Sequence, residues 1–255
     1  MGKVKNKKIV ITGASSGIGA EGARQLAAEG AYVILVARRS DELEQVVADI
    51  RKNGGQAEAH TADLSNYDDI DALAEALLAK HGKVDVLINN AGRSIRRSVR
   101  NSLERFHDYE RCMQINYFGL VRLTLKLLPP MLEAGDGHIV NVTTWATLVP
   151  SPRFAAYVAS KKAVDGFTES LDTELTGTGV STTLVHYPLV RTPMIAPTKL
   201  YSQLPAMSVE KAGRWLVKAV KRRPKRVVSP SMFSMGVGTM MNPRMSRWVS
   251  RKLGI

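Results

Sequence analysis

A short apolar run near the N-terminus leads directly into a glycine-rich turn. Residues 7–12 are typical of a buried strand, the run Thr12-Gly13-Ala14-Ser15-Ser16-Gly17-Ile18-Gly19 follows, and a helical pattern continues to residue 29. Strand, glycine-rich turn and helix form the context of a dinucleotide-binding turn, because glycines let a pyrophosphate approach the helix N-terminus. A plain glycine turn is the alternative. We predict dinucleotide binding through Gly13, Ser15, Ser16, Gly17, Ile18 and Gly19.

Strand and helix patterns alternate along the rest of the chain. Strands are expected at 7–12, 31–37, 56–61, 84–88, 137–142, 180–186 and 226–229. Helices are expected at 17–29, 40–53, 66–81, 103–131, 153–176 and 208–222. This alternation predicts a Rossmann-type doubly wound α/β fold, with about seven parallel strands and helices on both faces. Ligands of such sheets bind at the carboxyl ends of the strands.

The chain length and composition agree with this architecture. A chain of 255 residues suits one α/β domain, which we expect at 1–230, followed by a basic amphipathic extension at 231–255. No run of about 20 apolar residues is present, so no transmembrane helix is expected. The N-terminus lacks an apolar signal core, and the single Cys112 fits a reducing compartment. We therefore expect a cytoplasmic protein.

Tyr157 and Lys161 lie four residues apart in a predicted helix, and so on the same helix face. A neighbouring cation favours the phenolate and lowers the pKa of a tyrosine. Such a pair can transfer protons near neutral pH. The alternative is a helix surface with a tyrosine and a solvated lysine.

Four motifs together resemble those of the short-chain dehydrogenase/reductase family, of the single-domain type. They are Thr12-Gly13-x-x-x-Gly17-x-Gly19, Asn89-Asn90-Ala91-Gly92, Asn116 in Ile-Asn-Tyr-Phe-Gly, and Tyr157-x-x-x-Lys161. They span almost the whole chain in the family's order. The resemblance implies an oxidoreductase that uses a nicotinamide cofactor.

The resemblance also implies catalytic roles. Tyr157 would be the general acid/base, and Lys161 would lower its pKa and bind the nicotinamide ribose. Asn116 would hold a water in a proton relay to Lys161. Thr144 stands where the family usually has serine. The Thr144 hydroxyl has the same hydrogen-bonding capacity as a serine hydroxyl, so we expect Thr144 to be a working substitute. The alternative is a weakened or narrowed site. Thr143 is a less suitable substitute, because strand alternation turns its side chain to the other face of the sheet.

The end of the second predicted strand bears on the choice of cofactor. Ala37 occupies the position that is acidic in NAD-preferring members, and Arg38 and Arg39 follow it. A guanidinium suits a 2′-phosphate, so we predict NADP(H) rather than NAD(H), the alternative being plain surface charges. Asp63-Leu64 resembles an adenine-contacting pair, although Asp63 also suits a helix N-cap. The resemblance adds further cofactor contacts: Asn89, Asn90, Ala91, Gly92, Val190 and Thr192.

Two segments resemble a subgroup of the family, the bacterial long-chain fatty acyl-CoA reductases. One runs from Asn89 through the arginine-rich stretch to Arg111, and the other from Pro188 to Lys199. Tyr187-Pro188 replaces the family's usual Pro-Gly. The arginine cluster suits the phosphates of coenzyme A, an ordinary basic loop being the alternative. Candidate substrate contacts are Arg93, Arg96, Arg97, Tyr187 and Met194.

The C-terminal part carries the excess positive charge of the chain. Residues 211–255 hold twelve Lys or Arg and no Asp or Glu, within a whole-chain net charge of +13. Basic and apolar residues at helical spacing suggest peripheral contact with an anionic membrane. The alternative is that the tail covers a subunit interface or the substrate pocket.

Other partners and nucleophiles are not indicated. We expect no specific nucleic-acid binding and no metal site, because no motif for either is present. Cys112 lies four residues before Asn116, but no paired histidine adjoins it. We expect a buried free cysteine rather than a nucleophile.

We therefore predict an NADPH-dependent reductase of a hydrophobic, lipid-like carbonyl, with fatty acyl-CoA or fatty aldehyde as the leading substrate. A ketone, sterol or secondary-alcohol dehydrogenase is the first alternative. A non-catalytic NADP-binding sensor or scaffold is the second. The family resemblance implies a homodimer or homotetramer.

Overall fold

The computed structural model describes residues 4–196, 198, 201, 203–230, 234 and 238. Its centre is a seven-stranded sheet in the order β3-β2-β1-β4-β5-β6-β7. Every neighbouring pair of strands is parallel. The strands are β1 Lys8–Thr12, β2 Tyr32–Ala37, β3 Gln56–Thr61, β4 Val86–Asn89, β5 Gly137–Thr144, β6 Val180–Tyr187 and β7 Arg226–Val227. The predicted doubly wound fold is confirmed.

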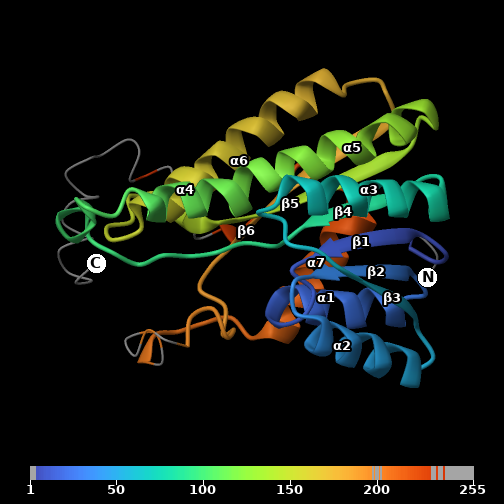
Figure 1. Ribbon diagram of the computed structural model, residues 1–255, viewed down its shortest axis with the longest axis horizontal. Coiled ribbons are helices and arrows are strands. Elements are labelled where there is room, and N and C mark those ends of the chain that lie inside the picture. The colour runs from blue at the N-terminus through green and yellow to red at the C-terminus, as the bar shows by residue number, and fades with distance from the viewer. Residues whose placement is uncertain are drawn as a thin grey trace.

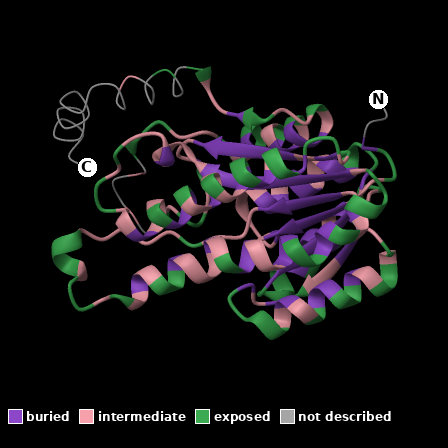
Figure 2. Cartoon of the chain, turned by 90° about the horizontal axis from the view of Figure 1, so that it is seen from above, coloured by how far each residue is buried: buried purple, intermediate pink, exposed green. Residues whose placement is uncertain are grey.

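Helices cover both faces of the sheet (Figure 1). One face packs on α1 Gly17–Ala28, α2 Ser40–Lys52 and α7 Val209–Arg222. The other packs on α3 Tyr67–His81, α5 Gly119–Glu133 and α6 Ala155–Glu174. Figure 2 shows the buried strands between the two helical layers. The apolar runs read as strands are buried on both sides, as parallel strands require.

The chain order reverses between β1 and β4. The chain winds outward from β1 to β3, returns to β4, and then winds to β7. At such a switch point the loops after two adjacent strands diverge and leave a crevice at their carboxyl ends. The glycine-rich turn after β1 and the Asn90–Gly92 segment after β4 lie at this crevice.

The helix predicted at 103–131 is wrong in its start and its continuity. A 3₁₀ turn at Val99–Ser102 precedes α4 His107–Met113, and a π-helical turn at Gln114–Phe118 joins α4 to α5. A Cβ atom on Gly119 would lie only 2.0 Å from the Leu64 carbonyl oxygen, so the helix passes very close to the chain after β3. Hydrophobic periodicity does not report an extra residue in one turn, and such turns occur at functional sites.

The C-terminal extension predicted at 231–255 lies outside the described residues, apart from Ser234 and Gly238. Among the helices that the structure describes, none is both long and apolar enough to cross a membrane.

Candidate active site

The turn after β1 is fastened to the end of β4. Thr12 Oγ1 accepts hydrogen bonds from the backbone N–H groups of Asn90, at 2.9 Å, and Ala91, at 3.0 Å. The Asn90 side-chain amide donates to the Thr12 carbonyl at 2.9 Å. A Cβ atom on Gly19 would lie 2.4 Å from the Gly13 carbonyl oxygen, and Gly13 itself has φ +65°. Only glycine fits these two positions, so the turn keeps one shape at the switch point.

The same turn ends at the N-terminus of α1. Its N-cap residue, Ser16, makes no side-chain capping hydrogen bond, and the first turn holds no acidic residue. The first backbone N–H groups of a helix lack intrahelical partners, and the helix dipole adds positive potential there. The glycine cradle and this helix end therefore fit the pyrophosphate of a dinucleotide.

Two arginines after β2 lie beside this turn. Arg39 Nη2 donates to the hydroxyls of Ser15, at 3.1 Å, and Ser16, at 3.0 Å. Arg38 instead pairs with Asp63 at 3.4 Å. The structure therefore places Arg39, more than Arg38, beside the glycine turn.

Asp63 is not the N-cap of a helix, the alternative role considered for it. Asp63 Oδ1 accepts hydrogen bonds from the backbone and hydroxyl of Ser65, and Asn66 caps α3. The adjacent Leu64 is 5 % exposed and packs in the core, so its side chain is not a surface for adenine.

The side chain of Thr144 faces the phenol of Tyr157 and acts to lower the pKa of that phenol. Tyr157 extends from the first turn of α6, and Thr144 ends β5. Thr143 is buried and its Oγ1 has no hydrogen-bond partner among the described residues. The expected orientation of the two threonines is observed: Thr144 faces the tyrosine, and Thr143 faces the sheet interior.

Lys161 lies in the interior beneath this pair. It is 3 % exposed, and its Nζ donates to the Val142 carbonyl at 2.9 Å. Burial lowers the pKa of Lys161 to about 8, and burial raises the pKa of Tyr157 to about 12, against the opposing effect of the Thr144 hydrogen bond. The prediction that Tyr157 has a lowered pKa is wrong in this structure, because desolvation of the phenolate dominates.

Asn116 lies within the π-helical turn and joins three segments. Its Nδ2 donates to Ser160 Oγ at 2.8 Å and to the Arg93 carbonyl at 2.9 Å, while its Oδ1 accepts from the Arg93 N–H at 2.7 Å. A Cβ atom on Gly92 would lie 3.0 Å from Asn116 Oδ1 and 3.5 Å from Lys161 Nζ. The structure thus brings the segment after β4, the π turn and α6 together, with Asn116 close to the segment that faces Lys161.

A polar network behind the site was not predicted. Asp165, one helical turn after Lys161, has a buried Oδ1 without a hydrogen-bond partner among the described residues. Its Oδ2 lies 4.0 Å from Nδ1 of the fully buried His186. The His186 Nε2 accepts from Arg226 at 3.2 Å, and Arg226 also pairs with Glu169. Arg226 can only donate, so His186 carries its proton on Nδ1, which lies 3.5 Å from the Thr144 carbonyl oxygen and 4.0 Å from Asp165 Oδ2.

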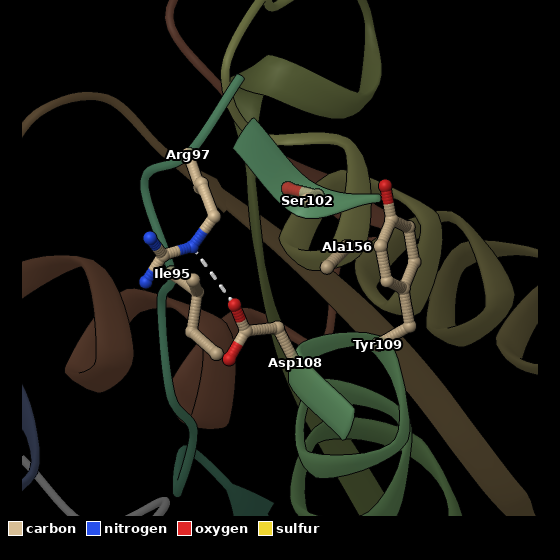
Figure 3. A pocket seen from close by; sticks show the side chains of 6 residues that line it. All are labelled: Ile95, Arg97, Ser102, Asp108, Tyr109 and Ala156. Atoms are coloured by element: carbon tan, nitrogen blue, oxygen red, sulfur yellow. Dashed lines mark hydrogen bonds and ion pairs between the residues drawn. The ribbon is translucent and has the colours of Figure 1, made fainter. Parts of the chain in front are cut away.

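The arginines after β4 divide into two kinds. Arg97 Nε donates to the buried Asp108 at 2.9 Å, and Arg105 donates to the same oxygen at 3.1 Å. These two arginines brace the segment, and Figure 3 shows the pair of Arg97 and Asp108. Arg96 instead contacts Tyr201, and its buried Nε has no hydrogen-bond partner among the described residues. Arg93 is exposed at the end of β4.

The cleft beside Arg97 and Asp108 is too small for an acyl chain. Figure 3 shows its lining, which consists of Ile95, Arg97, Ser102, Asp108, Tyr109 and Ala156. It holds about 10 Å³, room for about one water molecule. The ion pair of Arg97 and the size of this cleft argue against Arg97 as a substrate contact.

Two predicted contacts are corrected by burial. Tyr187 is 3 % exposed, its hydroxyl donates to the Ala212 carbonyl at 2.6 Å, and its ring stacks on Trp215. It is a core residue rather than a substrate contact. Asn89 is 2 % exposed and donates to Thr124 and Asn141, so its side chain supports the sheet instead of a cofactor.

The loop after β6 returns to the glycine turn. Val190 is buried and forms a parallel bridge with Met207. The Thr192 methyl would lie 3.2 Å from a Cβ atom on Gly17, which has φ +56°. Met194, a predicted substrate contact, is 51 % exposed on this loop.

Cys112 is buried and free, as expected. Burial raises the pKa of its thiol to about 11, so the thiolate is scarce at neutral pH. Chemistry at the site therefore rests on hydroxyl, ammonium and amide groups.

A glycine cradle at the switch point of a doubly wound sheet, with a tyrosine, a buried lysine and a threonine beside it, defines a nicotinamide-dependent oxidoreductase. Residues 7–201 match the sequence profile of the short chain dehydrogenase family. The chain belongs to the short-chain dehydrogenase/reductase family.

Similar proteins agree with this class. A fatty acyl-CoA reductase of Acinetobacter baylyi is 50 % identical over 226 residues, which cover 89 % of this chain and 77 % of that protein. A fatty acyl-CoA reductase of Mycobacterium tuberculosis is 46 % identical over 96 % of this chain and 82 % of its own length. The crystal structure of a metagenomic short-chain oxidoreductase in complex with NADP has a TM-score of 0.77 at 30 % identity, covering 89 % of this chain and 97 % of that one.

Proposed function

We propose that this protein reduces the carbonyl group of a hydrophobic, lipid-like substrate with NADPH, and that the substrate is a fatty acyl-CoA or a fatty aldehyde. The juxtaposition of the Tyr157 phenol and the Thr144 hydroxyl, at the carboxyl edge of the sheet, supports the carbonyl chemistry. The two fatty acyl-CoA reductases, 50 % and 46 % identical to this chain, support the substrate class.

When bound, the nicotinamide supplies a hydride to the carbonyl carbon. Tyr157 and Thr144 hold the carbonyl oxygen, and Tyr157 donates a proton to it as negative charge develops there. A pKa of about 12 keeps the proton on Tyr157 at neutral pH, which suits the acid role in the reducing direction. The more basic alkoxide oxygen can still take it.

Lys161 and Asn116 serve this proton transfer from behind. The charged Lys161 would stabilise the phenolate that Tyr157 becomes and would bind the nicotinamide ribose. Asn116 and Ser160 fix the segment that faces Lys161, and Asn116 would hold the water of a proton relay. The relay returns a proton to Tyr157 after each turnover.

Preference for NADPH is supported by charge at the glycine turn. Ala37 offers no carboxylate to a ribose hydroxyl, whereas Arg39, with Ser15 and Ser16, forms a cluster of donors beside the turn. Arg38 lies next to it. A 2′-phosphate would replace the serine hydroxyls as the partner of the guanidinium. The related oxidoreductase of 30 % identity is in complex with NADP.

The reduction of a thioester substrate to an aldehyde needs no nucleophile from the protein. Hydride adds to the carbonyl carbon and Tyr157 protonates the oxygen, which gives a hemithioacetal. Its carbon–sulfur bond then breaks, releasing a fatty aldehyde and the free thiol of coenzyme A. Arg96, with its unpaired Nε, and the exposed Arg93 and Met194 are the proposed substrate contacts.

The remaining features of the assembly are also proposals. Residues 1–230 would form the catalytic domain, and 231–255 would contact an anionic membrane at the inner face of the cell membrane or cover the pocket. The family resemblance supports a homodimer or homotetramer.

The test follows the loss of NADPH absorbance with acyl-CoAs, fatty aldehydes and ketones. We expect turnover with long-chain acyl-CoA or aldehyde and its loss in Tyr157→Phe. Turnover restricted to ketones or secondary alcohols would overturn the substrate class. Tight NADPH binding without turnover on any compound would overturn catalysis altogether.

A further inference from the structure

The segment after β4 carries three large apolar side chains at the surface. Val99 is 58 % exposed, Leu103 76 % and Phe106 72 %. They occupy the 3₁₀ turn Val99–Ser102 and the residues before α4. In Figure 1 this green segment extends away from the sheet, at the end of the molecule opposite the N-terminus. We call Val99, Leu103 and Phe106 the apolar tip.

The tip is held in place rather than loosely attached. Ser98 caps the 3₁₀ turn, and the Ser102 hydroxyl donates to the Ser98 carbonyl at 2.9 Å. The buried Asp108, which follows the tip, accepts hydrogen bonds from Arg97 before the tip and from Arg105 within it. The three exposed apolar side chains, held in this way, present a defined surface to a partner.

The charge around the tip is positive. Residues 93–111 contain six arginines and three acidic residues, a net charge of +3. One of the acids, Asp108, is buried and already paired. Arg93, Arg100 and Arg111 are exposed, and none of the three forms an ion pair with another described residue. The partner of the tip is therefore anionic at its rim and apolar within.

These properties favour a bilayer over a second copy of this chain. A two-fold interface built from this segment would bring together two copies of a stretch with a net charge of +3, and like charges in contact are unfavourable. A membrane with anionic lipid instead attracts arginines at its surface and accepts protruding apolar side chains below it, with no shaped groove. We propose that the apolar tip and its arginines dock the protein on an anionic lipid surface.

Docking through the tip would place the active site at the membrane. The segment 93–106 begins at Gly92, whose backbone lies close to Asn116 and Lys161. The functional value of this placement rests on the proposed function, because a lipid-like carbonyl substrate partitions into bilayers. Docking itself needs no turnover, so the docking proposal and the proposed function can be tested and can fail independently.

The test is sedimentation of the full chain with phosphatidylcholine vesicles, with and without phosphatidylserine. We expect binding that requires phosphatidylserine, and a loss of about tenfold or more in Leu103→Ser/Phe106→Ser, because two side chains would no longer be buried in lipid. Arg100→Gln should weaken binding as well. Leu125→Ser removes an apolar side chain that is 54 % exposed on α5, and serves as the matched control.

Three results would overturn the proposal. They are no binding to either vesicle, binding that is equal in the tip variant and Leu125→Ser, and conversion of an oligomer to a smaller species by the tip variant, measured by sedimentation velocity. The second would assign binding to residues 231–255, which all variants retain. Turnover of a short, water-soluble acyl thioester, measured in parallel, reports on the proposed function and on correct folding independently of docking.

Discussion

Asp165 lies one turn after Lys161 on α6, and its carboxylate raises the pKa of the buried Lys161 ammonium against the larger effect of burial. The net pKa of Lys161 is about 8, so it loses its charge at moderately alkaline pH. The proton-handling group of this site is thus tuned by a residue outside the Tyr157-x-x-x-Lys161 motif.

Asp165→Asn should shift the pH dependence of turnover. Without the carboxylate, desolvation of Lys161 is unopposed and its pKa falls below about 8. If turnover needs the charged lysine, activity at high pH should begin to fall at a lower pH than in the parent protein. The measurement is kcat/KM for NADPH oxidation as a function of pH. Glu174→Gln, which changes an exposed acid at the end of the same helix, is the control. Identical pH profiles for the parent and Asp165→Asn would show that Asp165 does not influence the protonation of Lys161 during turnover.

Thr144→Ala should lower kcat by about 100-fold, a loss typical of one positioned proton-transfer partner. The variant leaves the Tyr157 phenol without its hydroxyl partner at the carbonyl oxygen. Thr144→Ser keeps the hydroxyl and should retain most of the activity. If alanine and serine variants were equally active, the hydroxyl would have no part in catalysis. Steady-state kinetics with saturating NADPH separate this effect from cofactor binding.

Arg39→Ala should weaken NADPH binding by about tenfold, the value of one charge-assisted hydrogen bond, and leave NADH binding nearly unchanged. Both arginines form ion pairs, Arg38 with Asp63 and Arg39 with Glu42. Arg38→Ala should have the smaller effect, because only Arg39 also contacts Ser15 and Ser16 at the glycine turn. Fluorescence titration of both cofactors gives the dissociation constants. A larger loss of NADPH affinity in Arg38→Ala than in Arg39→Ala would show that Arg38 is the main 2′-phosphate contact, as the sequence alone suggested.

Patterns that lie within one segment were predictable from the sequence. The apolar runs before Gly13 and Asn89 gave the strand positions to within two residues, because a buried parallel strand is apolar on both faces. Thr144 and Tyr157 were placed by spacing within a family pattern. The structure adds that the Thr144 side chain faces the Tyr157 phenol.

Features that depend on the approach of distant segments were not predictable. The phenol of Tyr187 finds its acceptor in α7, and the burial of this ring cannot be seen in the run Tyr187-Pro188. His186 and Asp165 are ordinary polar residues in the sequence, and they meet only because β6 packs against α6. Arg39 was ranked below Arg38 because chain order does not show which guanidinium turns toward Ser15 and Ser16.

Glu58→Gln should destabilise the fold and remove part of its acid sensitivity. Glu58 is 6 % exposed on the edge strand β3 and accepts hydrogen bonds from four side chains, those of Tyr32, His60, Lys80 and His81. Burial tends to raise the pKa of Glu58, but these donors outweigh it and hold the pKa well below its usual range. A carboxyl group with a lowered folded pKa stabilises the protein above its unfolded pKa of about 4.3, and this contribution is lost as the pH falls.

Removing the charge from such a buried network should cost about 3 kcal/mol at neutral pH. Urea unfolding at several pH values checks both parts of the expectation: the variant should be less stable at pH 7, and the difference from the parent should shrink below about pH 4, where the unfolded carboxyl group binds a proton. Asp41→Asn, at an exposed position in the first turn of α2, is the matched control and should leave the pH dependence almost unchanged. A constant difference between parent and Glu58→Gln across this range would show that the loss comes from packing rather than from the ionised carboxylate.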